Sequence, residues 1–125
     1  MRAFRPKANP HNGPEAKIQQ AIIDRLKAHD WYVKVIVGNA FQFGLPDLFA
    51  AHAHWGMRWI EVKNPLQFSF TPAQIQEFPK LNAAGVGVWI LFSDEKDELD
   101  KLFKPANWFE IYFRWSNSAM ARPIL

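Results

Sequence analysis

Hydrophobic residues at helical spacing predict a helix over residues 15–29, and three short apolar segments after it predict strands. The apolar stripe of the helix consists of Ile18, Ala21, Ile22 and Leu26. Pro14 suits the first position of such a helix. Strands are expected at residues 31–37, 48–53 and 57–63, because these segments are rich in β-branched, aromatic and other apolar residues and are separated by turn-forming residues. The first half of the chain therefore predicts one helix followed by three strands.

A second helix is predicted to begin at Thr71 and to end before Gly85. Pro72 suits its first position, and glycine is common just past the end of a helix. Pro79 lies inside this segment. Because an internal proline removes a backbone hydrogen bond and costs about 3 kcal/mol, we expect a kink or an early end near residues 77–78.

The last third of the chain predicts two more strands with a short helix between them. Residues 86–92 form a continuous apolar run, which is typical of a strand buried on both faces. A short acidic helix capped by Ser93 or Asp94 is expected to run to Phe103, and the alternation over residues 108–115 predicts a final strand. The order α-β-β-β-α-β, then a short helix and a final strand, predicts a mixed central sheet flanked by helices, in the α/β or α+β class.

Length and charge refine this picture without identifying a function. A chain of 125 residues suits one domain, which we place at residues 14–125. The net charge of +3 permits a polyanionic partner without requiring one. Residues 1–13 are expected to form an irregular basic arm, which either contacts phosphates or only solvates the terminus. Its cationic side chains are Arg2, Arg5 and Lys7.

The absence of cysteine removes several classes of chemistry. Disulfides, thiol nucleophiles, iron–sulfur clusters and cysteine-ligated zinc sites are excluded, which favours oxygen-bound cations as the metals. No apolar run approaches the ~20 residues that span a bilayer, and the polar beginning of the chain has no apolar signal segment. We therefore expect the cytoplasm as the compartment.

Two of the predicted strands contain acids at positions where a carboxylate is costly unless it is paired or bound to a metal. Asp47 precedes the second strand directly, and Glu61 lies inside the third. Because side chains alternate along a strand, Glu61 and Lys63 share a face with Trp59. Glu15 lies at helical spacing from the apolar stripe of the first helix, which aims a third carboxylate toward the sheet.

Three acids and a lysine on one face match the needs of metal-assisted phosphodiester hydrolysis. Carboxylates hold Mg²⁺ through oxygen ligands, the ion activates water and neutralises charge on the phosphate, and an ammonium orients that water. Each residue alone also has a simpler interpretation: a turn acid for Asp47, a solvent-facing pair for Glu61 and Lys63, and a helix-dipole acid for Glu15. Their ordered combination favours a catalytic site.

The sequence GLPD at residues 44–47, followed by IEVK at residues 60–63, resembles the motif of the PD-(D/E)XK nuclease superfamily. Residues 15–91 as a whole, from EAKIQQAIIDRLKA through FTPAQIQEFPKLNAAG, are similar to the stand-alone VRR-NUC domains, a group found in phages and bacteria and related to Holliday junction resolvases. The resemblance implies a restriction-endonuclease-like α/β core. Two departures are Val-Lys-Val at residues 33–35, where the family name records Val-Arg-Arg, and the proline inside the second helix.

The resemblance also implies a role for each matching residue. Asp47 and Glu61 would bind the metal together with the backbone carbonyl of Val62. Lys63 would act on the nucleophilic water, and Glu15 would complete the site through a water. The implied cofactor is Mg²⁺, with Mn²⁺ as a substitute.

Two further residues are carried over from the resemblance, Gln74 with an alternative interpretation and Lys34 without one. Gln74 would hold the catalytic lysine or a phosphate, but the sequence Thr71-Pro72-Ala73-Gln74 equally fits a capping box, in which the glutamine only closes the start of the helix. Lys34 would partly replace the basic substrate contact of the family.

The implied activity is Mg²⁺-dependent endonucleolytic cleavage of DNA that leaves a 5′-phosphate and a 3′-hydroxyl. A small domain offers little surface for reading base sequence, so Holliday junctions or other branched DNA are the expected substrates. Symmetric junction cleavage needs two active sites, hence we expect a homodimer, with residues 41–43 and the final strand as candidate interfaces. The alternatives are a general or restriction-type nuclease on the same fold, and a non-catalytic DNA-binding subunit.

Overall fold

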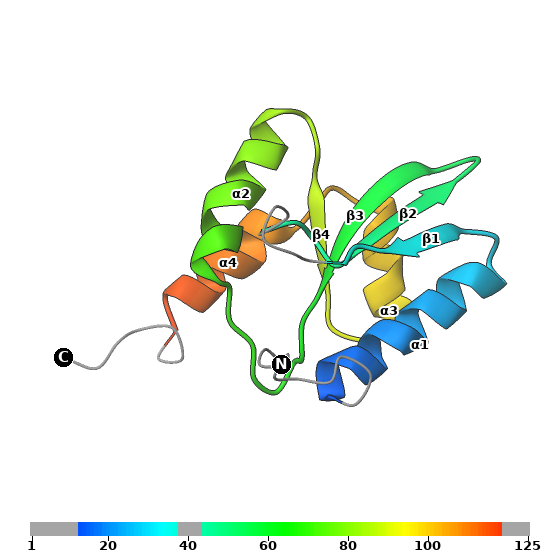
Figure 1. Ribbon diagram of the computed structural model, residues 1–125, viewed down its shortest axis with the longest axis horizontal. Coiled ribbons are helices and arrows are strands. Elements are labelled where there is room, and N and C mark those ends of the chain that lie inside the picture. Colours follow the sequence, from blue (N-terminus) through cyan, green and yellow to red (C-terminus); the bar gives the residue numbers. More distant parts are fainter. Residues whose placement is uncertain (1–12, 38–43, 119–125) are drawn as a thin grey trace, which may run out of the picture.

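Four strands form one mixed sheet in the computed structural model, which describes residues 13–37 and 44–118. The strands are β1 (Tyr32–Val35), β2 (Leu48–His52), β3 (Gly56–Val62) and β4 (Val88–Leu91). The helices are α1 (Pro14–Ala28), α2 (Pro72–Ala83), α3 (Lys96–Leu99), the 3₁₀ helix η1 (Asp100–Phe103) and α4 (Trp108–Ser116). The strands lie in the order β1-β2-β3-β4, antiparallel except for the parallel pair β3–β4 (Figure 1). The predicted α-β-β-β-α-β order and mixed sheet are confirmed.

Helices cover the two faces of this sheet unequally. On one face, α1 buries Leu26 in a core that includes Leu48 of β2 and Ile60 of β3. On the other face, α2 and α4 form a second core against β4, with Phe78 and Trp108 among its buried residues. Figure 1 shows α1 and α3 on one side of the sheet and α2 and α4 on the other. The second core contains no residue of β1, β2 or β3 among the described residues, so it covers only the β4 end of its face.

Residues 108–116 form the helix α4, so the predicted final strand is wrong. The residues of α4 that pack in the second core are Trp108, Ile111, Tyr112 and Trp115. Their spacing is i, i+3, i+4 and i+7, which is a helical period. The aromatic residues between them, Phe109 and Phe113, are exposed. Because this short helix has apolar residues on both its buried and its exposed sides, its sequence also fits the alternating pattern of a strand.

A side chain also occupies the place that a further strand would take beside β4. The Asn107 amide accepts a hydrogen bond from the Ile90 backbone nitrogen at 2.6 Å and donates one to the Ile90 carbonyl at 3.1 Å. The Glu98 carboxylate accepts from the Phe92 nitrogen at 2.9 Å. These contacts satisfy polar backbone groups at an edge of the sheet, where unpaired groups invite another strand.

Helix α2 continues through Pro79 to Ala83, so it does not end early at residues 77–78. Phe78 is fully buried, and its ring centroid lies 5.7 Å from that of Trp108. Leu81, beyond the proline, packs against the same core. Tertiary packing on both sides of Pro79 therefore offsets the lost backbone hydrogen bond.

Three further expectations from the sequence concern membrane crossing, the basic N-terminal arm and a dimer interface. Within the described residues, no helix has both the length and the apolar character needed to cross a membrane. The basic residues of the predicted N-terminal arm, Arg2, Arg5 and Lys7, lie outside the described residues, as does the candidate interface at residues 41–43.

Candidate active site

The antiparallel pairing of β2 and β3 brings Asp47 and Glu61 to the same part of the sheet. Leu48 pairs with Ile60, so the residues that flank this pair lie side by side on the other face. The Val62 backbone nitrogen donates a hydrogen bond to Asp47 Oδ2 at 2.9 Å. Glu61 is only 2% exposed. The predicted pair of carboxylates is therefore present, with one of the two deeply buried.

Lys63 lies beside Glu61, as the alternation of β3 predicted. Its Nζ atom is 3.1 Å from Glu61 Oε2 and donates a hydrogen bond to Gln74 Oε1 at 3.1 Å. The same ammonium lies 4.9 Å from the centroid of the Phe70 ring. The lysine is 5% exposed, so these three neighbours hold its charge in a largely dry environment.

Gln74 closes the start of α2 and joins the site at the same time. The Thr71 hydroxyl accepts from the Gln74 backbone nitrogen, and Gln74 Oε1 accepts from the Thr71 nitrogen, each at 3.1 Å. These two bonds form the capping box. Gln74 Nε2 also donates to Glu61 Oε2 at 2.8 Å. The two interpretations of this glutamine are thus compatible, because the capping geometry aims its amide at Glu61 and Lys63.

Burial and a neighbouring negative charge disfavour the charged form of each carboxyl group. Burial, followed by the charge of Asp47, raises the pKa of Glu61 to about 8, against the opposing effects of Lys63 and Gln74. Burial likewise raises the pKa of Asp47 to about 6, with Glu15 adding to the shift and the Val62 nitrogen opposing it. Groups with such raised pKa values cluster at functional sites.

The donor set fits a hard divalent cation. Glu61 Oε1 is buried and has no hydrogen-bond partner among the described residues, so one lone-pair-bearing oxygen is available in the site. A cation bound there would satisfy this oxygen and would offset the burial and the nearby negative charges that raise the two pKa values. Oxygen ligands of this kind are those that Mg²⁺ and Mn²⁺ take in proteins.

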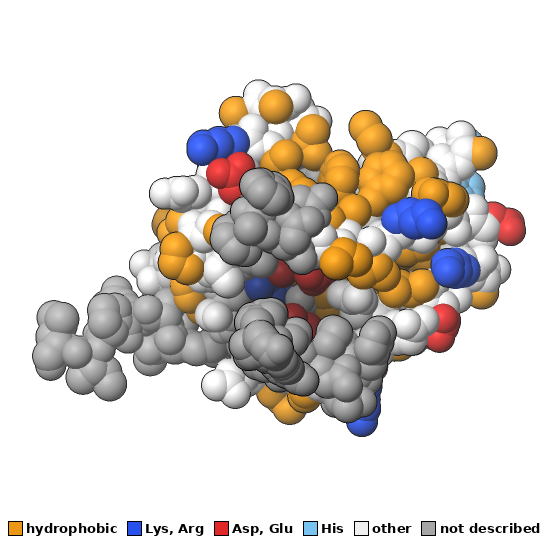
Figure 2. Space-filling model, in the orientation of Figure 1, with side chains coloured by type: hydrophobic (Ala, Val, Ile, Leu, Met, Phe, Trp, Pro, Cys, Tyr) orange, Lys and Arg blue, Asp and Glu red, His pale blue; other side chains and the backbone are white. Residues whose placement is uncertain are grey.

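Glu15 occupies a more peripheral position than the sequence predicted. It is exposed at the beginning of α1, and it lines a hollow of about 510 Å³ together with Lys63 and four residues of the segment between β3 and α2. In the described part of the chain, no three His, Cys, Asp or Glu side chains are grouped closely enough to hold a metal ion. Glu15 therefore faces the same hollow as the lysine without completing a three-carboxylate cage. Figure 2 shows acidic and basic side chains together in a hollow at the centre of the face drawn.

Lys34 lies apart from the buried cluster, on the exposed surface of β1. It pairs with Phe49 across the sheet, and its Nζ atom is 5.9 Å from the centroid of the Tyr32 ring. Since side chains opposite one another share a face, Lys34 lies on the face that carries Asp47 and Glu61.

Two residues that support the site were not identified as site residues from the sequence. Phe70 forms the wall beside the Lys63 ammonium, and only the tertiary fold brings it there. Gly44 has φ +84°, and a Cβ atom on it would lie 2.7 Å from Glu77 Cγ and 2.8 Å from the Ala73 carbonyl oxygen. The segment that leads to Asp47 therefore rests directly on α2. Its signal in the sequence was the glycine three residues before the aspartate.

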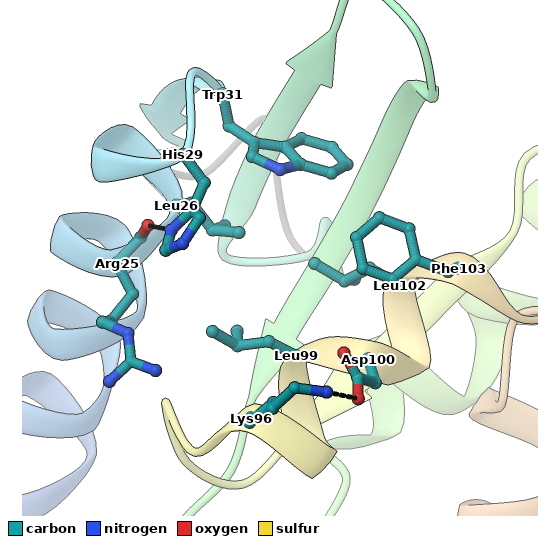
Figure 3. Close-up of a pocket in the computed structure, with 9 residues that line it drawn as sticks. All are labelled: Arg25, Leu26, His29, Trp31, Lys96, Leu99, Asp100, Leu102 and Phe103. Atoms are coloured by element: carbon teal, nitrogen blue, oxygen red, sulfur yellow. Dashed lines mark hydrogen bonds and ion pairs between the residues drawn. The ribbon is translucent and has the colours of Figure 1, made fainter.

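A second pocket, of about 320 Å³, lies between α1 and the segment formed by α3 and η1 (Figure 3). Leu26 and Leu102, which line it, belong to the core on the opposite face of the sheet from Glu61. None of the predicted site residues lines this pocket. The chemistry-bearing residues are thus concentrated on the other face.

Comparisons with known proteins bear on the fold. No protein-family model matches the sequence, and no curated protein matches it. Among solved structures, a VRR_NUC domain is similar over 71% of this chain and 92% of its own, with a TM-score of 0.59 and 24% sequence identity. The Holliday junction resolvase Hjc of Archaeoglobus fulgidus, an archaeal hyperthermophile, aligns over 62% of this chain and 66% of its own, with a TM-score of 0.49 and 14% identity. The similarity to the VRR_NUC domain confirms the restriction-endonuclease-like α/β fold expected from the sequence.

Proposed function

We propose that the protein is a divalent-metal-dependent endodeoxyribonuclease that hydrolyses phosphodiester bonds and leaves a 5′-phosphate and a 3′-hydroxyl. One observation carries the proposal: Glu61 is buried with one oxygen unpartnered, while its other oxygen is bound by Lys63 and Gln74. A fold selected for stability alone has no reason to retain a buried carboxylate in this state.

We assign each residue a role that its position supports. Asp47, Glu61 and the carbonyl of Val62 would hold Mg²⁺ or Mn²⁺, which supplies charge neutralisation at the phosphate and a more acidic water. Glu61 and Gln74 hold Lys63 and leave part of its hydrogen-bond capacity free, which would orient the attacking water or bind a phosphate oxygen. Glu15, at the rim of the hollow, would act through a water.

The substrate proposed is branched DNA, such as a Holliday junction, cut by a homodimer. The domain is small, which favours selection by shape and phosphate contacts over the reading of bases. The exposed aromatic residues of α4, Phe109 and Phe113, stay as a candidate interface now that this element is a helix. The cytoplasm remains the proposed compartment, and Arg2, Arg5 and Lys7 remain proposed phosphate contacts.

Two alternatives make different demands on the site. A general or restriction-type nuclease would use the same residues but would cut linear duplex as readily as junctions. A non-catalytic DNA-binding subunit would not need the buried, partly unpartnered Glu61, so the geometry favours an enzyme over this alternative.

The test is cleavage of an end-labelled four-way junction beside matched linear duplex, flap and single strand, in Mg²⁺ or Mn²⁺. Glu61→Gln keeps the shape of the side chain and removes its charge, and Glu110→Gln, at an exposed carboxylate of α4, is the matched control. We expect junction or flap cleavage by the wild type and the control, and its loss in Glu61→Gln.

A second readout, the melting temperature, detects metal binding without cleavage. Mn²⁺ should raise the melting temperature of the wild type, because binding adds RT ln(1 + [L]/Kd) to its free energy of unfolding, about 2.7 kcal/mol at 100 times Kd. It should have little effect on Glu61→Gln. Cleavage of every substrate with equal rate would remove the claim of branched-DNA selectivity. DNA binding without cleavage and without stabilisation by metal would contradict the enzyme hypothesis and support a non-catalytic DNA-binding subunit.

A further inference from the structure

A part of the sheet that no described helix covers adjoins the candidate active site on the same face. We call it the open face and define it by residues of β1, β2 and β3: Tyr32, Lys34, Phe49, Met57 and Trp59. The register places Tyr32 opposite Ala51 and Ala51 opposite Met57, and in the next row Lys34 opposite Phe49 and Phe49 opposite Trp59. Since residues opposite one another share a face, these side chains form two adjacent rows across three strands.

The open face is exposed because the helices of this side pack elsewhere. The second core, built by α2 and α4, includes none of its residues. Tyr32 is 56% exposed and Met57 is 58% exposed, whereas Phe49 and Trp59 in the next row are partly buried. Figure 2 shows hydrophobic side chains gathered over the strands, beside the hollow that contains the charged groups. An apolar surface with this much exposure generally marks a binding site.

The open face runs directly into the catalytic carboxylates. Phe49 follows Asp47 by two residues, and Trp59 precedes Glu61 by two. Two residues of a strand span about 7 Å, so the aromatic pair stands beside the carboxylate pair on the same surface. The Phe49 and Trp59 ring centroids are 5.1 Å apart in an edge-on arrangement. A DNA strand whose phosphate lies at Glu61 therefore has this pair as its neighbour.

The chemistry of the open face fits unpaired nucleotides. Base–aromatic stacking binds single strands without reading their sequence, whereas bases inside a duplex hide their faces and leave phosphates to be bound. Among the described strand residues of the open face itself, Lys34 is the charged one, and its ammonium lies over the Tyr32 ring. An aromatic surface with a cation at its β1 edge matches a single strand, which offers bases and phosphates together.

We propose that the open face binds an unpaired segment of DNA next to the scissile phosphate, by stacking bases on Trp59, Phe49 and Tyr32 and by pairing a phosphate with Lys34. This inference rests on the proposed nuclease function and specifies its substrate: a flap or a branch point with unpaired nucleotides on the side of the open face. A second copy of this chain is the rival occupant. A symmetric pairing of two open faces would cover both Lys34 ammonium groups without an acidic partner among the residues of the open face, which disfavours it.

The experiment measures DNA binding apart from cleavage. The probes are a fluorescein-labelled oligothymidine and a labelled duplex of equal length, titrated by fluorescence anisotropy in EDTA. The variants are Tyr32→Leu and Trp59→Leu, which remove a stacking ring and keep apolar volume. Phe103→Leu is the control, because Phe103 is 44% exposed and lines the pocket on the opposite side of the sheet. Melting temperatures identify any variant that fails to fold, and the exposed position of Tyr32 keeps at least one variant usable.

We expect Tyr32→Leu and Trp59→Leu to weaken oligothymidine binding about 10-fold and duplex binding less than 2-fold, with Phe103→Leu unchanged. In Mg²⁺, the two variants should also lose the preference of the enzyme for flap over linear duplex. If the wild type binds oligothymidine in this ring-dependent way but cuts no substrate, the open face binds unpaired DNA as proposed and the proposed nuclease function is wrong.

Other outcomes overturn the inference. Cleavage of DNA with an unchanged flap preference in both variants keeps the nuclease and removes the open face from substrate binding. Equal weakening of duplex and single strand shows that the rings do not stack unpaired bases. A dimer in sedimentation velocity that Tyr32→Leu dissociates, with oligothymidine binding intact, assigns the open face to a second copy.

Discussion

At Glu61 the requirements of stability and of function point in opposite directions. Glu61 Oε2 has good partners in Lys63 and Gln74, but Oε1 is buried without one among the described residues. Removing a carboxylate from water and leaving an oxygen unpaired is unfavourable by about 1 to 3 kcal/mol or more. The same geometry prepares an oxygen ligand in a place where Asp47 adds a second negative charge. The proposed role of Glu61 as a metal ligand would account for both features.

This conflict predicts how stability depends on pH in the absence of metal. The pKa of Glu61 is raised from 4.5 to about 8, and that of Asp47 from 3.8 to about 6. Between about pH 4 and 8 the folded protein thus retains protons that the unfolded chain has released, so the contribution of these groups to the free energy of unfolding falls as the pH rises. In EDTA, we expect the melting temperature of the wild type to fall more steeply from pH 5.5 to 8.5 than that of Glu61→Gln.

The exposed Glu110→Gln variant controls for loss of a surface charge and should follow the wild type. Parallel pH profiles for the wild type and Glu61→Gln would mean that Glu61 ionises normally in the folded protein. In that case neither burial nor the charge of Asp47 would disfavour the charged form of Glu61.

At the scale of the element, α2 connects helix stability to the site through Gln74. Thr71→Ala removes one bond of the capping box and leaves the Gln74 contacts with Glu61 and Lys63 in place, so we expect a loss of about 1 kcal/mol in stability with cleavage within about 2-fold of the wild type. Gln74→Ala removes both sets of contacts. It should cost similar or greater stability and lower the cleavage rate by about 10- to 100-fold, by analogy with other residues that orient catalytic ligands.

Denaturant unfolding and initial rates on the preferred substrate measure these two effects separately. Both variants weaken the start of α2, so a difference between their cleavage rates reports the contacts of Gln74 with Glu61 and Lys63. Equal cleavage rates in Thr71→Ala and Gln74→Ala would show that Gln74 acts only as a cap, which was the simpler interpretation of the sequence.

The segment before β2 also depends on α2, through the close approach at Gly44. Gly44 and Gly85 both have positive φ, +84° and +89°, but only at Gly44 does an added Cβ meet neighbours, at 2.7 and 2.8 Å. Gly85→Ala should therefore cost about 1 kcal/mol for its backbone conformation, and Gly44→Ala about 3 kcal/mol in total, because α2 or the segment leading to Asp47 must also move. Urea unfolding compares the two, and equal losses would show that the contact with Glu77 and Ala73 adds no strain.

For the molecule as a whole, the parts that local patterns determine were predictable and the parts that depend on tertiary context were not. The strand period placed Glu61 and Lys63 on one face, and the structure bears this out. Residues 108–115 satisfied a strand pattern and a helical one, and the choice was made by burial against Phe70 and Phe78 in the second core. Glu15 had an inward helical phase, yet its position at the first turn of α1 leaves it exposed. The periodicity of a sequence predicts the direction in which a side chain points. How deeply that side chain is buried depends on which other segments pack against the end of its helix or strand.

The predicted homodimer is also a property of the whole molecule, and a mixing experiment tests it together with the number of active sites. Each subunit carries one candidate site, so a dimer of 14.5 kDa subunits would cut two strands of a junction, one at each site. When wild-type subunits are mixed and equilibrated with a tenfold excess of Glu61→Gln, most wild-type subunits enter mixed dimers. We expect the junction product to change from paired cuts to single nicks, read on a supercoiled cruciform plasmid as nicked circles in place of linear DNA.

A monomeric enzyme gives a different result in the same experiment. Its ratio of nicked to linear product would not depend on the excess of inactive protein, because each wild-type subunit would act alone. Sedimentation velocity on the same mixtures supplies the mass independently of activity. A dimer whose product ratio stays constant would mean that subunits do not exchange, and co-expression of the two chains with different tags would then provide the mixed species directly.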